Sequence, residues 1–220
     1  SSSNYAQNVR YSFSDGIFKA SSPITYPDKE SSLTFYAVYP FGNYSVPELR
    51  FSVSKDQSSE LAYTESDLMT ASAMAKDKEV VDLKFSHRLA KVVFNLNLGA
   101  NASKDQSVTL CKVYTNLDAD ISGNNFKEKG SKSDVIAAPN GENSFKVILP
   151  PQKIAAGTLY ARFEIGDKTY DLTADSDIYL SSGIEHIYGV TFKEDSVEIT
   201  ADIIDWNEEH GEVSADRYKK

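Results

Sequence analysis

Residues 83–98 read LKFSHRLAKVVFNLNL, and this stretch indicates the class of fold. From Leu83 to Leu89 the apolar side chains and His87 occupy odd positions, whereas from Val92 to Leu98 the alternating apolar set occupies even positions. A regular strand cannot change parity, because its side chains alternate between the two faces at every residue. We therefore expect either a β-bulge near Leu89–Ala90 or a strand that leaves one sheet and joins another. Both arrangements are typical of a β-sandwich.

Segments with apolar residues at every second position recur on both sides of this stretch, at 33–39, 49–53, 159–165, 188–192 and 197–203. Gly166-Asp167 follows the third segment and predicts a hairpin over 159–172, and the last two segments predict a second pair of strands. Only residues 65–78, ESDLMTASAMAKDK, favour a helix, through Ala and Met, although an irregular connection is the alternative. The pattern predicts an all-β fold.

The polar stretch GANASKDQ at 99–106 is the best candidate for a linker between domains. A cut there leaves about 100 residues on each side, which is enough for a domain to fold alone. We expect two tandem β-sandwich domains, at 1–99 and 104–206, followed by a charged tail at 207–220. One continuous sandwich is the alternative.

The composition narrows the possible partners and environments. The chain has 220 residues, with 23 Lys and Arg against 32 Asp and Glu, and this acidic balance argues against nucleic acid as a partner. The sequence contains no run of 18 consecutive apolar residues, so no transmembrane helix is predicted. Cys111 is the single cysteine, which excludes an intramolecular disulfide and a cysteine-based metal site. Because the chain begins SSSN without Met, we expect a mature or trimmed form from which any targeting segment has been removed.

The histidines give little support for catalysis. His87 lies in phase with its apolar neighbours, which favours a hydrogen-bonded core histidine over a catalytic base. We expect His186 and His210 to be solvated. No Gly-x-Ser-x-Gly motif is present to mark a nucleophile elbow.

The acidic clusters are no stronger as sites. Residues 118–123 read DADISG and match the opening of a calcium loop, but Lys129 stands where a bidentate Glu is needed, so a polar turn between strands is expected. The carboxylates at 202, 205, 208 and 209 fit a charged surface better than a glycosidase pair. We predict no enzyme activity, no cofactor and no metal.

Several phrases together resemble one family: LTFYAVYPF at 33–41, the run at 51–71, VDLKFSHRLAKVVFNL at 81–96, VILPPQ at 147–152 and TADIIDW at 200–206. They are similar to the fimbrillin-like proteins of anaerobic gut and oral Gram-negative bacteria, which are structural and accessory subunits of type V pili. The resemblance spans residues 11–206. Its most specific residues form the family core motif: Phe85, His87, Leu89, Ala90, Lys91 and Trp206.

The resemblance implies tandem transthyretin-like, Greek-key β-sandwiches that are exported as lipoproteins to the outer membrane and cell surface. It further implies that an arginine-specific protease removes an N-terminal segment, after which a strand from a neighbouring pilin subunit fills the groove. Arg10 is then the candidate cleavage site, with an ordinary surface arginine as the alternative; removing residues 1–10 would delete a short strand at best. The lipid-bearing cysteine is not in this chain, so an N-terminal anchor on the precursor is implied by the resemblance alone.

The charged tail at 207–220, NEEHGEVSADRYKK, lacks the alternating apolar residues of a donor strand. We therefore expect a subunit that accepts a strand but donates one poorly, at a pilus tip or in an accessory position. Asp195-Ser196-Val197 matches a short pattern for O-glycosylation in related bacteria, which makes Ser196 a weak candidate.

Two functions of different kinds are compatible with this sequence. The first is a pilus subunit that adheres to a host protein or glycan receptor. The alternative is a non-polymerising surface carbohydrate-binding module that uses exposed aromatic side chains at Tyr26, Tyr44 or Trp206. Tyr44 follows Pro40-Phe41-Gly42-Asn43, a sequence typical of a loop, so we expect it to be the most exposed of the three. Trp206 better fits a plug at the end of the last strand.

Overall fold

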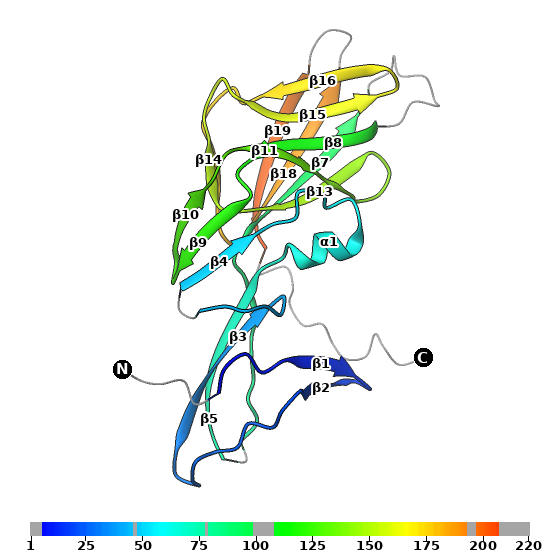
Figure 1. The fold of residues 1–220 in the computed structure, drawn as a ribbon. Coiled ribbons are helices and arrows are strands. Elements are labelled where there is room, and N and C mark those ends of the chain that lie inside the picture. Colours follow the sequence, from blue (N-terminus) through cyan, green and yellow to red (C-terminus); the bar gives the residue numbers. More distant parts are fainter. Residues whose placement is uncertain (1–5, 46–47, 78, 99–107, 193–196, 207–220) are drawn as a thin grey trace.

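The computed structural model describes residues 6–45, 48–77, 79–98, 108–192 and 197–206, and within 197–206 the side chains of Ile203 and Trp206. Almost every regular element in these residues is a β-strand (Figure 1). The all-β expectation is thereby confirmed.

Two sheets packed face to face form the upper part of the molecule (Figure 1). The first has five strands, in the order β12 (Ala138–Pro139), β13 (Ser144–Leu149), β7 (Ala90–Asn97), β18 (Ile184–Phe192) and β19 (Val197–Asp205). The second has four, in the order β11 (Ser133–Ile136), β8 (Val108–Thr115), β15 (Leu159–Ile165) and β16 (Lys168–Thr173). Neighbouring strands in both sheets run antiparallel, except that β7 and β18 are parallel.

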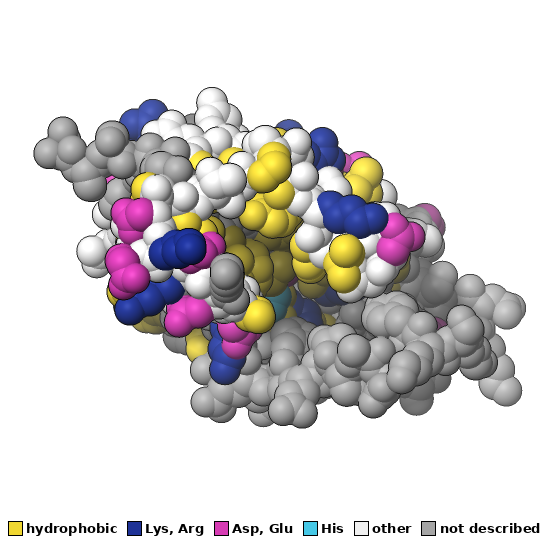
Figure 2. Space-filling model, turned by 90° about the horizontal axis from the view of Figure 1, so that it is seen from below, with side chains coloured by type: hydrophobic (Ala, Val, Ile, Leu, Met, Phe, Trp, Pro, Cys, Tyr) yellow, Lys and Arg dark blue, Asp and Glu magenta, His cyan; other side chains and the backbone are white. Residues whose placement is uncertain are grey.

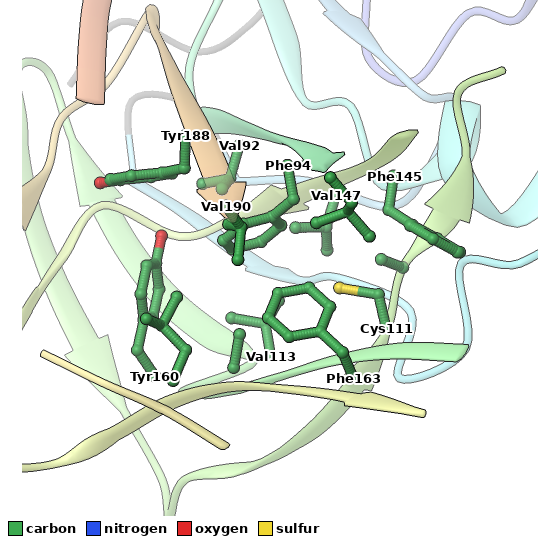
Figure 3. Close-up of a cluster of buried hydrophobic side chains, with 14 of the residues drawn as sticks. Val92, Phe94, Cys111, Val113, Phe145, Val147, Tyr160, Phe163, Tyr188 and Val190 are labelled. Atoms are coloured by element: carbon green, nitrogen blue, oxygen red, sulfur yellow. The ribbon is translucent and has the colours of Figure 1, made fainter. Parts of the chain in front are cut away.

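The main core fills the space between these two sheets (Figure 3). Phe94 of β7 is fully buried, and its ring centroid lies 5.7 Å from that of Tyr160, 5.6 Å from that of Phe163 and 5.6 Å from that of Tyr188. Cys111 packs in the same core, and burial raises the pKa of its thiol well above the ordinary range. A buried protonated thiol of this kind is a packing residue.

A second core lies on the other face of the five-stranded sheet. It is covered by helix α1 (Glu60–Glu65) and by a three-stranded sheet with the order β10 (Asn125–Lys129), β9 (Asp118–Ser122) and β4 (Glu48–Ser52). Strand β13 serves both cores, since Val147 and Leu149 enter the first and Ile148 enters the second. The Gln57 side chain joins this core by donating to the Ile148 carbonyl at 2.8 Å and accepting from the Ile148 N–H at 2.9 Å.

The remaining strands form three small sheets. Strands β14 (Gln152–Ile154) and β17 (Ile178–Leu180) pair beside the sandwich. At the lower end of the molecule lie a separate hairpin of β1 (Tyr11–Ser14) and β2 (Ile17–Ala20) and a sheet with the order β3 (Ser32–Tyr39), β5 (Met69–Lys76) and β6 (Ser86–His87) (Figure 1).

The change of parity in residues 83–98 marks a strand that changes sheets. Strand β6 ends at His87 in the lower sheet, and β7 begins at Ala90 in the five-stranded sheet. The second of the two expected explanations is therefore confirmed. The hairpin over 159–172 and the strand pair at 188–203 are also confirmed, as β15–β16 and β18–β19.

The expected helix at 65–78 is wrong. Helix α1 ends at Glu65, and residues 69–76 form β5, which pairs with β3 from Met69↔Tyr39 to Lys76↔Ser32. Ala71 and Ala75 are buried on one face of this strand. Strand pairing and burial on one face prevail here over the helix propensity of alanine.

The expected boundary at 99–104 lies outside the described residues, and the strands before and after it, β7 and β8, both belong to the sandwich. Strand β7 pairs with β13 and β18, and β4 pairs with β9, so strands from both sides of the boundary share sheets. The tandem transthyretin-like arrangement stays a prediction, and the tail at 207–220 lies outside the described residues.

Candidate functional site

The lower sheet has an open edge. Within the described residues β3 pairs with β5 alone, and β6 covers only the first two residues of β5. The outer edge of β3, from Ser32 to Tyr39, therefore has no strand partner in this part of the chain. An edge of this kind presents N–H and C=O groups on which a further strand can form.

Large apolar side chains are exposed on the same sheet. Tyr36 of β3 and Met74 of β5 lie on one face, since Tyr36 is opposite Ser72 and Thr34 is opposite Met74, and these two side chains are 66% and 71% exposed. A sheet that shows apolar side chains to water on one face gains free energy when that face is covered.

The hairpin β1–β2 adds to the exposed apolar surface. Its four large apolar side chains are all exposed, and the Phe13 and Phe18 rings lie with centroids 5.1 Å apart: Tyr11, Phe13, Ile17 and Phe18. A two-stranded hairpin without further strands is only marginally stable in water. Seen from the end where these strands lie, hydrophobic side chains gather around a hollow (Figure 2). We call the open β3 edge, the exposed Tyr36–Met74 face and this hairpin the lower surface.

Arg10 lies directly before β1 and is exposed. Two contacts attach it to its surroundings: its carbonyl accepts from the Ser21 N–H at 2.7 Å, and its guanidinium lies 5.5 Å from the centroid of the Phe41 ring. Residues 6–10 contain no strand, so a cut after Arg10 leaves β1 in place. The role of Arg10 as a cleavage site stays a prediction.

The structure brings three residues of the sequence motif together where the lower sheet meets the sandwich. The rings of His87 and Trp206 stack, with centroids 3.6 Å apart and planes 7° from parallel. His87 Nδ1 lies 2.9 Å from Asp67 Oδ1, which confirms the expected hydrogen-bonded histidine. Lys91 Nζ lies 2.8 Å from Glu185 Oε1 and 5.7 Å from the centroid of the Trp206 ring. We call these five residues the motif cluster.

The other motif residues have separate roles. Leu89 packs in the second core and Ala90 in the first, both without exposed surface, so these two residues carry the chain from one core to the other. Phe85 is 44% exposed and is not among the residues of either core. Trp206 is 3% exposed, which confirms a plug at the end of the last strand and removes it as a binding platform.

Sequence reasoning missed Asp67 and Glu185. Asp67 follows helix α1 and Glu185 lies in β18, far from their partners in sequence. No local spacing pairs Glu185 with Lys91; only the parallel register, in which these two residues are opposite, brings them together.

Two other sequence expectations need correction. His186 is 2% exposed rather than solvated, because it lies in β18 between two paired strands, and its burial lowers the pKa of its imidazole. Tyr44 is half-buried rather than exposed, because it packs against the second core. Tyr26 is half-buried too, and its ring lies 6.3 Å from that of Phe35. Ser196 and His210 lie outside the described residues.

The expected polar turn at 118–123 is wrong for most of the stretch, because Asp118–Ser122 form strand β9 and only Gly123 lies in the turn of the β9–β10 hairpin. Lys129 forms an ion pair with Asp120, and Arg50 lies 3.6 Å from the same carboxylate. Across the described ranges no group of three or more histidine, cysteine or acidic side chains could hold a metal ion. In the same ranges no helix has the length and apolar character needed to cross a bilayer.

Comparison with known proteins identifies a family for nearly the whole chain. A family model described as fimbrillin-like matches residues 1–206. No curated protein sequence matches the chain.

Solved structures with the same fold come from several Bacteroides species. A putative cell adhesion protein from Bacteroides uniformis ATCC 8492 has a TM-score of 0.68 and 19% identity, over 86% of this chain and 79% of that chain. A second, from Bacteroides ovatus ATCC 8483, has a TM-score of 0.67 and 20% identity, over 90% and 78%. A fimbrial protein from Bacteroides vulgatus ATCC 8482 has a TM-score of 0.59 and 14% identity, over 92% and 86%. At these identities the likeness establishes the fold alone.

Proposed function

Because this chain belongs to the fimbrillin-like family, we propose that it is a subunit of a cell-surface fimbria with a structural role and no catalysis. The names of its structural neighbours, which are fimbrial and putative cell adhesion proteins, support this proposal. Its partners are then other fimbrial subunits. The family resemblance extends the proposal to an exported precursor with an N-terminal lipid anchor in the outer membrane, and to a host protein or glycan as receptor.

The open edge of β3 is the observation that carries the mode of assembly. An extended segment from a neighbouring subunit would pair with β3 and satisfy its outer N–H and C=O groups. Apolar side chains on that segment would pack beside Tyr36, which is 66% exposed in the isolated chain. Strand addition at the lower surface would therefore supply both backbone hydrogen bonds and apolar burial.

Cleavage after Arg10 would act on the same surface. The cut would separate the hairpin from Arg10. The hairpin would then no longer be linked through Arg10 to the Phe41 ring, beside which the guanidinium lies, and the hydrogen bond from the Ser21 N–H would no longer close a continuous chain. The hairpin β1–β2, which shares no sheet with other described strands, would then be joined to the chain only through the segment that follows β2, and could move away from the sheet of β3, β5 and β6. In this proposal the protease opens the lower surface without deleting a strand.

A tip or accessory position follows from the tail at 207–220. A donor strand needs apolar side chains at alternate positions, and the sequence of this tail lacks them. These residues would therefore make a poor donor strand, and we propose a tip or accessory position on that ground.

The proposal is tested by brief digestion of the folded protein with an arginine-specific protease. Intact mass would locate the cut, and size-exclusion chromatography would follow association with a stalk-type subunit present and absent. We expect one early cut after Arg10, followed by association, and no association of Arg10→Lys under the same conditions.

A matched pair of variants tests the surface itself. Tyr36→Lys places a charge on the proposed strand-addition face, whereas Tyr179→Lys places the same charge on a side chain of similar exposure, 62%, in β17. We expect the first variant to lose association and the second to keep it. Two results would contradict the proposal. One is a cleaved wild-type protein that stays monomeric with the stalk-type subunit present. The other is a Tyr36→Lys variant that associates as the wild type does.

A further inference from the structure

The hairpin of β1 and β2 has one apolar face, at the lower end of the molecule and apart from the sandwich (Figure 1). Side chains of residues that are opposite each other in an antiparallel pair point to the same side. The register places Tyr11 opposite Ala20, and it places Phe13 opposite Phe18. These four side chains therefore form one face. Its three aromatic members are 49%, 65% and 69% exposed in chain order, so this face is open to solvent.

The other face of the hairpin is mostly polar. Ser12 is opposite Lys19, and Ser14 is opposite Ile17. The Lys19 ammonium lies 2.8 Å from the carboxylate of Asp15, in the turn of the hairpin. Ile17, which is 57% exposed, is the one large apolar side chain among the described residues on this side. The hairpin is therefore amphipathic, with a polar turn and a polar back.

The apolar face is too small for a stable protein interface. Three aromatic side chains of about 200 Å² each, exposed by roughly half to two-thirds, offer about 400 Å². A stable protein complex buries about 800 Å² on each partner, with about one hydrogen bond per 100–200 Å². Of the four side chains on this face, only Tyr11 has a polar atom, its hydroxyl. A second copy of the chain or another protein would find too little area and too few hydrogen-bonding groups here.

A lipid surface has neither requirement. In the interfacial layer of a bilayer, phenyl rings enter the boundary of the acyl chains and a tyrosine hydroxyl stays at the level of the headgroups. The aromatic surface continues at the base of the hairpin, where the Arg10 guanidinium lies 5.5 Å from the centroid of the Phe41 ring, which is 54% exposed. An arginine at this place can bury its stem in the interface and keep its charge among the headgroups.

The charge of this part of the chain indicates which lipid it suits. Residues 6–45 carry no net charge, because three basic residues stand against three acidic ones: Arg10, Lys19 and Lys29 against Asp15, Asp28 and Glu30. The acidic surplus of the chain, with 32 Asp and Glu against 23 Lys and Arg, therefore lies elsewhere. An anionic membrane would repel that surplus and gain no attraction from the hairpin, so a neutral lipid surface is favoured.

We propose that the apolar face of the β1–β2 hairpin inserts into the interface of a bilayer of neutral phospholipid. Phe13 and Phe18 then lie at the boundary of the acyl chains, while the polar back and the turn remain in water. The outer N–H and C=O groups of these short strands stay within reach of water and headgroups, because the hairpin does not cross the bilayer. The inference goes beyond the proposed function, because it needs neither a covalent lipid anchor nor strand addition at β3.

The first test is cosedimentation of the uncleaved chain with phosphatidylcholine vesicles. A small apolar patch of this kind gives a partition constant on the order of 10³–10⁴ M⁻¹, no higher than that of a single myristoyl chain, so half of the protein should sediment at about 0.1–1 mM lipid. Phosphatidylglycerol added to the vesicles should not increase the bound fraction at low salt. Phe13→Ser combined with Phe18→Ser should weaken binding by at least about tenfold, whereas Ile17→Ser should leave it within about twofold of the wild type.

A matched pair of tryptophan substitutions identifies the face that inserts. Phe18→Trp and Ile17→Trp place an indole at neighbouring positions on opposite faces, and the native Trp206, which is 3% exposed, contributes a constant emission to both. With vesicles we expect the first variant to shift its emission to the blue and to be quenched by brominated phosphatidylcholine. We expect neither change in the second. This readout does not depend on a loss of binding, so an altered hairpin stability cannot imitate it.

Three results would overturn the proposal. The first is a wild-type protein that stays in the supernatant at about 5 mM lipid. The second is equal quenching of the Phe18→Trp and Ile17→Trp variants. The third is a dimer that forms without lipid and is lost in Phe18→Ser, since a second copy would then cover this face. The protein is uncleaved and no other subunit is present, so none of these results bears on strand addition.

Discussion

Replacing Trp206 by alanine removes the side chain that joins the end of β19 to the lower sheet. Trp206 is 3% exposed, and its ring stacks on His87 with the Lys91 ammonium 5.7 Å from its centroid. Its backbone N–H donates to the Gly183 carbonyl at 2.9 Å, a contact that alanine retains. The substitution therefore tests the ring alone.

The expected cost follows from the area that the ring buries. A buried tryptophan side chain removes about 200 Å² from water, which at about 25 cal/mol per Å² corresponds to about 5 kcal/mol. Residual burial in the unfolded chain reduces this to about 3–4 kcal/mol. The cavity left against His87 raises it again, so we expect a loss of about 3–5 kcal/mol in the free energy of unfolding. This is a large part of the about 5–15 kcal/mol that holds a typical domain folded.

The assay is urea unfolding followed by far-UV circular dichroism, since Trp206 is the only tryptophan and the variant has no indole fluorescence. Trp206→Phe keeps an aromatic ring over His87 and should lose less than half as much stability. Ile203→Ala, at a side chain of β19 that is 68% exposed, should change stability by less than about 1 kcal/mol. A loss below about 1 kcal/mol for Trp206→Ala would refute the reading of the motif cluster as the joint between the lower sheet and the sandwich.

Three further predictions concern buried groups. Burial lowers the pKa of His186 in the folded protein, so below about pH 6.5 the unfolded chain binds more protons than the folded one. The contribution of neutral His186 to stability is therefore full above that pH. It declines as the pH falls toward the lower folded pKa. Urea unfolding between pH 8 and pH 5, at about unit intervals, should show this slope in the wild type and a shallower one in His186→Gln. Gln57→Leu leaves the N–H and C=O of Ile148 without their side-chain partner and should cost about 2–4 kcal/mol by the same assay, whereas a near-neutral result would mean that these groups find another partner. Gly42→Ala forces the Tyr44 ring to move and should cost about 1–3 kcal/mol, with a change in near-UV circular dichroism; an unchanged spectrum would contradict the packing of the ring on the glycine.

The sequence predicted those strands whose apolar residues alternate cleanly. Strands β3, β15 and β18 each bury one set of alternate side chains more deeply than the other, which is why a period of two was visible. The parity change at 83–98 was informative for the same reason, since Leu89 and Ala90 pack in different cores.

The failures have physical causes as well. Residues 69–76 contain alanines that suit a helix, and only pairing with β3 makes them a strand. The motif residues were recognised, but their contacts were not, because Glu185 and Trp206 reach His87 and Lys91 only through the register of β18 with its two neighbours. The row that Leu49, Ile121 and Phe126 form across β4, β9 and β10 was beyond reach for the same reason, because β4 lies far in sequence from the β9–β10 hairpin with which it pairs.

The parallel pairing of β7 with β18 sets the order in which the protein can fold. Strand β7 ends at Asn97, but one of its two neighbours begins only at Ile184, so the central sheet cannot close until most of the chain has been synthesised. Contacts of such long sequence separation form slowly, because the entropy of a large loop must be lost first. Until then Val92 and Phe94 lack half of the core that buries them. The central sheet of the nascent chain therefore stays incomplete, with one edge of β7 unpaired, until β18 has been synthesised.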